Sequence, residues 1–160
     1  MAMNNLGPAE WFVVGAIGPP GKRRFYFQVV ADGNRHSLLA EKQQVEALAS
    51  QGWRSLQRSG VEVDATAVES ILSSDLEIDD PAGAEDFRVG TINVGIRPSG
   101  LMNISFESDR DEQGLMFMVS PEQFRAMALL ARRLVRAGRP ICPWCRLPKN
   151  PDGHECPARN

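Results

Sequence analysis

Two stretches of this chain occur twice, in the same order. Residues 12–17 read FVVGAI and residues 87–92 read FRVGTI, with Phe, Val, Gly and Ile at equivalent positions. Further along, residues 39–49 (LAEKQQVEALA) align with residues 118–128 (MVSPEQFRAMA). A repeat of this kind predicts a chain built from two similar units, and a fold assignment that ignored it would misplace the elements.

Each unit has the pattern of three strands followed by a helix. The strands are short runs rich in β-branched and aromatic residues, and they end at turn residues such as those of GPPG and PSG. Because these runs are too short for helices, strands are the better assignment. The predicted strands are 11–17, 23–31 and 36–40 in the first unit, and 87–96, 101–107 and 115–119 in the second.

The helix of the second unit has the clearer start. Ser120 is a predicted N-cap, a proline follows at the first helical position, and Gln123 can complete a capping box. Apolar residues then recur at helical spacing until Gly138 provides a stop. The first helix begins near Glu41 by the same spacing, and Gly52 is expected to weaken or kink it.

These elements predict an α+β fold in which duplicated β-β-β-α units form an antiparallel sheet with helices on one face, followed by a zinc-knuckle-like tail. The predicted body spans residues 1–138. Its parts are repeat one (11–58), an acidic connection (59–84) with a short helix capped by Asp64, and repeat two (85–138). The predicted zinc-binding tail spans residues 139–160.

The composition is that of an ordinary folded protein, with 42% hydrophobic and 24% charged residues. No run approaches the roughly 20 apolar residues that cross a bilayer, and the first residues lack the pattern of a signal peptide. We therefore expect a cytoplasmic protein with no membrane partner. A net charge of -2 argues against a strongly basic nucleic-acid binder, although residues 61–86 carry nine acids and no Lys or Arg, and residues 125–160 are mainly basic.

The tail gathers all three cysteines and one of the two histidines within the segment ICPWCRLPKNPDGHECP, residues 141–157. A Cys-x-x-Cys turn lets two thiolates reach one ion, and the PDG turn brings a second pair of ligands back over the first. Three cysteines and one histidine are a common closed set for structural zinc. The sequence therefore predicts one structural Zn²⁺ held by Cys142, Cys145, His154 and Cys156.

Other uses of these cysteines stay open. A redox Cys-x-x-Cys belongs at the start of a thioredoxin-like helix, whereas this pair follows the last helix. A disulfide would leave one odd thiol and does not suit a reducing cytoplasm. Catalytic zinc keeps a position for water, which four protein ligands would close. Iron and a metal-free tail remain further alternatives.

Three functions are compatible with these residues. The first is a non-enzymatic module that presents Trp144, with the basic Arg139 and Arg146, to a protein partner. The second is a nucleic-acid-binding protein that uses the knuckle and the basic C-terminal helix, through Arg132, Arg133 and Arg136. The third is an enzyme with a small-ligand cleft between the repeats, for which no nucleophile and base pair is recognisable and no catalytic residue is predicted.

Several motifs resemble an uncharacterised actinobacterial family, the domain of unknown function DUF3090. They are FVVG (12–15), GPPG (18–21), LAEKQQV (39–45), EDFRVGT (85–91), AGRPICPWC (137–145) and PDGHECP (151–157). The resemblance covers nearly the whole chain. It implies a cytoplasmic bacterial protein with the same four tail ligands, and it supplies no substrate. The family's knuckle tends to have Gly after the second Cys, where this chain has Arg146.

Overall fold

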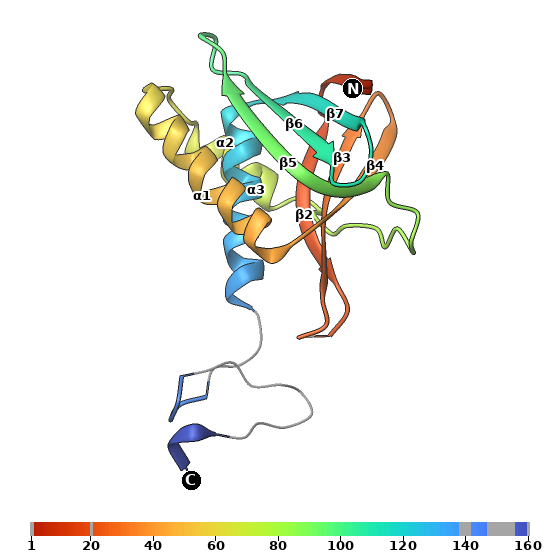
Figure 1. Cartoon of the computed structure of the whole chain (residues 1–160). Coiled ribbons are helices and arrows are strands. Elements are labelled where there is room, and N and C mark those ends of the chain that lie inside the picture. Colours follow the sequence, from red (N-terminus) through yellow and green to blue (C-terminus); the bar gives the residue numbers. More distant parts are fainter. Residues whose placement is uncertain (1, 20, 138–141, 147–155, 160) are drawn as a thin grey trace.

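The computed structural model of the chain describes residues 2–19, 21–137, 142–146 and 156–159. Its α-helices lie together on one side of a curved sheet (Figure 1). The strands are β1 (Ala2–Pro8), β2 (Trp11–Ile17), β3 (Arg24–Ala31), β4 (Asn34–Ala40), β5 (Phe87–Ile96), β6 (Met102–Ser108) and β7 (Gln113–Val119). The helices are α1 (Lys42–Ser59), α2 (Ala65–Leu72), α3 (Pro121–Arg136) and a short 3₁₀ turn, η1 (Pro157–Arg159).

The α+β class is confirmed, with all seven strands in one sheet of order β1-β7-β6-β5-β4-β3-β2. The three strands of each predicted unit pair antiparallel with one another. The sheet as a whole is mixed, because β4 pairs with β5 and β1 with β7 in parallel. β4 and β5 can pair in parallel because the long connection through α1 and α2 returns the chain to the same end of the sheet.

Residues 2–17 join the two ends of this strand order. Their first part, β1, pairs with β7, and their second part, β2, pairs with β3. The change of partner falls at Ala9 and Glu10, whose amides donate to the carbonyl oxygens of Met118 and Val30, both at 2.8 Å. The sheet therefore curls into a ring in which the peptide chain itself links the first and last strands. The sequence analysis placed no strand before residue 11.

Aromatic side chains from both units fill the inside of the ring. Phe12 on β2 meets Phe117 on β7 edge to face, with ring centroids 4.9 Å apart, and Phe27 on β3 stacks on Phe106 of β6 at 5.1 Å. All four rings are buried. Alternation along each strand places these residues on the inner face, so the two units share one core.

The helices close the remaining side of this core. Ser120 caps α3 through a complete capping box with Gln123, as predicted, and α3 buries Phe124 and Met127. The expectation that Gly52 would kink α1 is not met, since α1 runs unbroken through it. A Cβ on Gly52 would lie 2.2 Å from Cζ of Phe124, so the glycine makes room for that ring between the two helices.

The connection between the units is packed against the body rather than merely crossing its surface. Its helix, α2, is capped by Asp64 as predicted and buries Val68. Beyond α2, the side chain of Ile78 lies against Gly15, where a Cβ would come within 2.6 Å. At the end of the connection Asp86 binds the amide of Ser37 at 3.0 Å and Nδ1 of His36 at 2.9 Å.

Each half of the body thus contains three antiparallel strands and a helix in the same order. That the halves arose by duplication stays a prediction, as do the domain boundaries. Within the ranges that the structure describes, none of the helices has both the length and the apolar character needed to cross a bilayer.

Candidate metal centre

The first part of the candidate site is a tight turn that starts at Cys142. The amide of Arg146 donates to the carbonyl oxygen of Cys142 at 2.9 Å, which folds the Cys-Pro-Trp-Cys segment back on itself. Arg146 adopts a left-handed backbone conformation, with φ of 61°. Glycine is the residue best suited to that conformation, and an arginine there carries some backbone strain. The turn nevertheless forms with Arg146 in place.

The three cysteine sulfurs converge in space. Sγ of Cys142 lies 3.7 Å from Sγ of Cys156, and the sulfurs of Cys142, Cys145 and Cys156 all lie within 4.8 Å of one another. Thiolates at about 2.3 Å from a tetrahedral zinc stand about 3.8 Å apart. The three thiols therefore have the spacing of ligands that share one ion.

The surroundings of Cys142 favour its thiolate. Its side chain is buried. Hydrogen bonds from the backbone amide of Cys145, and secondarily from that of Trp144 and from the neighbouring thiols, lower the pKa of Cys142 to about 6, although burial opposes this shift. Backbone amides directed at sulfur are the usual support of a Cys-x-x-Cys metal site, because they stabilise the negative charge that a metal ligand carries.

The remaining predicted residues of the tail are placed only in part. Trp144 projects from the turn with 56% of its surface exposed, and Arg146 beside it is exposed as well. His154, the predicted fourth ligand, and Arg139 lie outside the described residues. The structure thus brings together three of the four predicted ligands, and the prediction of His154 stays a prediction.

The predicted arginines of α3 do not all line the same groove. Arg132 and Arg136 stand one helical turn apart and line a groove between α1 and α3. Arg133, next to Arg132 in sequence, is exposed outside that groove. The groove's other arginines, Arg54 and Arg125, were not among the predicted site residues. A helical wheel would have found Arg125, because it precedes Arg132 by seven residues.

The aromatic residues of β3 cannot stack on nucleic-acid bases. Phe25, Tyr26 and Phe27 are all buried. His36 pairs with Asp86, and neither residue lines the groove between α1 and α3. The described residues therefore offer a cysteine cluster and a basic groove as their two chemically distinctive features.

Comparison with known proteins agrees with the motif resemblance. The model of the family described as "Protein of unknown function (DUF3090)" matches residues 5–156, a range that includes all three cysteines. Neither the curated proteins nor the solved structures contain a match to this chain.

Proposed function

The chain belongs to the DUF3090 family, whose description assigns no activity, and we propose that it is a zinc-binding protein in which the metal shapes the tail for contact with a protein partner. The observation that supports this proposal best is the convergence of the three sulfurs of Cys142, Cys145 and Cys156. In the proposal His154 supplies the fourth ligand and one Zn²⁺ is bound.

The donor set supports zinc in a structural role. Three thiolates with one imidazole form a closed tetrahedron that leaves no position for a substrate or for reactive water. A site built from reduced thiols also suits a reducing compartment, so we place the protein in the cytoplasm. The ion would supply much of the folding free energy of a segment that has little apolar core of its own.

Metal analysis of the purified full-length protein tests the site. We expect one equivalent of zinc in the wild type, most of it lost in Cys142→Ser and in Cys156→Ser. His154→Ala should lower the zinc affinity, while His36→Gln, which changes the other histidine, should keep full occupancy. Equal zinc contents in His154→Ala and His36→Gln would remove His154 from the ligand set.

Cobalt substitution separates zinc-type coordination from the alternatives. A protein loaded with Co²⁺ at this site should show the intense visible absorption of a tetrahedral thiolate complex. A weak octahedral spectrum, or iron in the protein as purified, would contradict the structural zinc site.

The interaction role rests on Trp144. An exposed aromatic side chain on a metal-held turn is a suitable anchor for a partner, because it offers a large apolar surface at low conformational cost. Trp144→Ala should leave the zinc content unchanged and weaken binding of a partner identified with the wild type and then purified. Leu101→Ala is the matched control, since Leu101 is also a large exposed apolar residue, at 39%, but lies on the body. Equal affinities of the wild type and Trp144→Ala would refute this role.

A further inference from the structure

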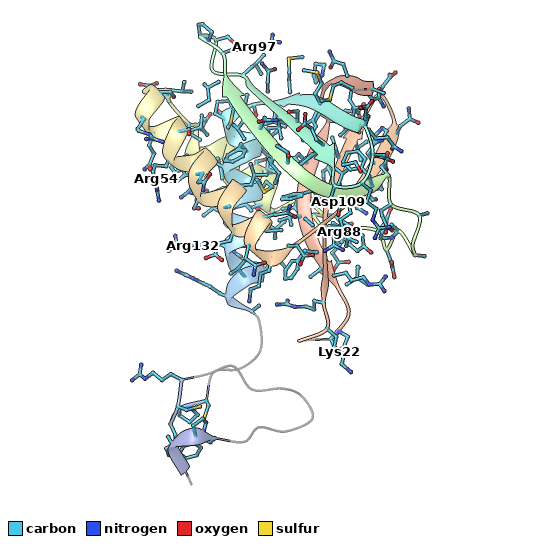
Figure 2. All side chains as sticks on the ribbon, viewed as in Figure 1. Lys22, Arg54, Arg88, Arg97, Asp109 and Arg132 are labelled. Carbon is cyan, nitrogen blue, oxygen red and sulfur yellow. The ribbon has the colours of Figure 1, made fainter. Side chains whose placement is uncertain are left out.

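A basic groove runs between α1 and α3, the helices that follow the strands of each unit. Its volume is about 510 Å³. Figure 2 labels Arg54 on α1 and Arg132 on α3, both on the helical side of the molecule. The charged and aromatic residues that line the groove are Glu46, Trp53 and Arg54 from α1, and Arg125, Arg132 and Arg136 from α3.

Among the residues that the structure describes, the charge of this groove is not balanced. Four guanidinium groups line it, against one carboxylate, that of Glu46. No ion pair between described residues includes Arg54, Arg125, Arg132 or Arg136. By contrast, Arg35 and Arg88 elsewhere on the body each pair with a carboxylate. The groove therefore presents a concentrated positive charge to solvent.

The arginines also affect one another. Burial, with a smaller contribution from the charge of Arg132, lowers the pKa of Arg125. An arginine remains protonated even so, which means that Arg125 and Arg132 repel each other as cations in a partly enclosed site. A bound anion would relieve this repulsion, because it brings opposite charge between the two guanidinium groups.

Trp53 holds one of these arginines in position. The guanidinium carbon of Arg125 lies 3.8 Å from the centroid of the Trp53 ring, in a cation-π contact. This contact restrains the guanidinium at the wall of the groove, and a stacked guanidinium keeps the N–H groups at its edge available to a ligand. A preorganised arginine binds an anion with a smaller loss of side-chain entropy than a free one.

We propose that the groove between α1 and α3 binds a small organic molecule that carries at least two phosphate groups. Guanidinium groups match phosphate oxygens through paired N–H donors, so several arginines in one groove suit a ligand with several phosphate oxygens. The volume falls within the range of about 300–1,000 Å³ that is usual for small-molecule sites. An extended nucleic acid fits less well, because Arg133 lies outside the groove and the aromatic residues Phe25, Tyr26 and Phe27 are buried.

Calorimetric titration of the full-length protein with inorganic pyrophosphate tests this site. The wild type should bind in a saturable manner, and Arg132→Gln or Arg54→Gln should each weaken the affinity by about tenfold. Arg133→Gln is the matched control, because it removes the same charge from the same helix outside the groove. We expect its affinity to stay within about twofold of the wild type.

Other results would overturn the proposal. One is that pyrophosphate does not bind in a saturable manner. Another is an equal loss of affinity in Arg132→Gln and Arg133→Gln, which would indicate a diffuse charge effect. Heat from chelation of a tail metal by pyrophosphate would be the same in both variants, so it cannot imitate the expected difference. A single-stranded oligonucleotide that binds more tightly than pyrophosphate, and loses affinity equally in both variants, would favour nucleic acid instead. Arg54, Arg132 and Arg133 are all exposed, so their variants should fold normally. Equal thermal midpoints would verify this.

Discussion

The side-chain amide of Gln28 forms two hydrogen bonds with the backbone of Asp79, one as donor and one as acceptor, as a paired strand does. Its Nε2 donates to the carbonyl oxygen of Asp79 at 2.6 Å, and its Oε1 accepts from the amide of Asp79 at 3.0 Å. Gln28 lies on β3 and is fully buried, while Asp79 belongs to the connection between the two units. One side chain thus fastens the connection across the outer face of β3.

The same amide has further partners on β4. Its Nε2 donates to Oγ of Ser37 at 3.0 Å, and its Oε1 accepts from Arg35 at 2.9 Å. Arg35 in turn pairs with the carboxylate of Asp79 at 3.2 Å and lies over the ring of Trp11. Every hydrogen-bonding group of the Gln28 carboxamide is therefore used, as a buried polar side chain requires.

We expect Gln28→Ala to release the connection and to destabilise the protein by about 1–3 kcal/mol, because it removes the partner of the buried Ser37 hydroxyl and of the Asp79 backbone. Urea denaturation measures the loss, and faster hydrogen exchange at the Asp79 amide locates it. Asn34→Ala, at an exposed side chain of the neighbouring strand, should change the stability by less than about 0.5 kcal/mol. Unchanged exchange at Asp79 would contradict this role of Gln28.

Gly52→Ala should destabilise the packing of α1 on α3. Alanine normally favours a helix over glycine by about 1 kcal/mol, but here its Cβ would overlap the ring of Phe124. We expect a net loss of about 1–3 kcal/mol from this overpacking. Gly95→Ala is the control, since nothing lies within 4 Å of its added Cβ. In Phe124→Leu the smaller side chain should make Gly52→Ala less harmful, and additive losses in the double variant would speak against the clash.

Ser120→Ala should remove the N-cap of α3. The Ser120 hydroxyl accepts from the Gln123 amide at 3.1 Å, and the Gln123 side chain accepts from the Ser120 amide at 2.8 Å. Loss of such a cap costs about 1 kcal/mol, which a shift in the denaturation midpoint would report. Ser120→Asp should recover most of this loss, because a carboxylate also caps a helix. A loss of the same size in Ser120→Asp would point to a role other than capping.

The backbone of Arg146 predicts which residues this position tolerates. At a φ of 61°, Arg146→Gly should keep the turn, whereas the β-branched side chain of Arg146→Val would strain it by about 1–2 kcal/mol more. Both variants remove the same positive charge, so their difference isolates the backbone effect. A competition assay with a zinc chelator should therefore give a weaker affinity for Arg146→Val, by about tenfold. Equal affinities would show that the turn does not control the site.

Local signals in the sequence were sufficient for most elements. The alternation of Phe25 and Phe27, the cap at Ser120 and the spacing of Cys142 and Cys145 each depend on neighbours a few residues away, and each corresponds to a feature of the structure. The strand β1 was missed because its sequence, AMNNLGP, has no alternation of apolar and polar residues to reveal it. It is held by backbone pairing with β7 rather than by an apolar face.

Contacts between distant segments could not be predicted in the same way. The pairing of Gln28 with Asp79, the room that Gly52 leaves for Phe124 and the approach of Arg54 to α3 all depend on how the two units pack. For the candidate metal centre, the short separation of the three cysteines in sequence predicted that their sulfurs would lie close together, and they do. Metal binding by them stays a prediction. His154 lies outside the described residues and stays a prediction.

The bridging role of residues 2–17 has a consequence for the protein's solubility. Were β1 detached from β7, the backbone donors and acceptors of β7 would be left unpaired next to an aromatic interior, and another polypeptide could add to them. The stability of this largely exposed strand would then decide whether the protein stays monomeric or self-associates. A charged tag or a missing residue at the amino end would therefore change self-association while leaving the cysteine cluster and the basic groove unaltered.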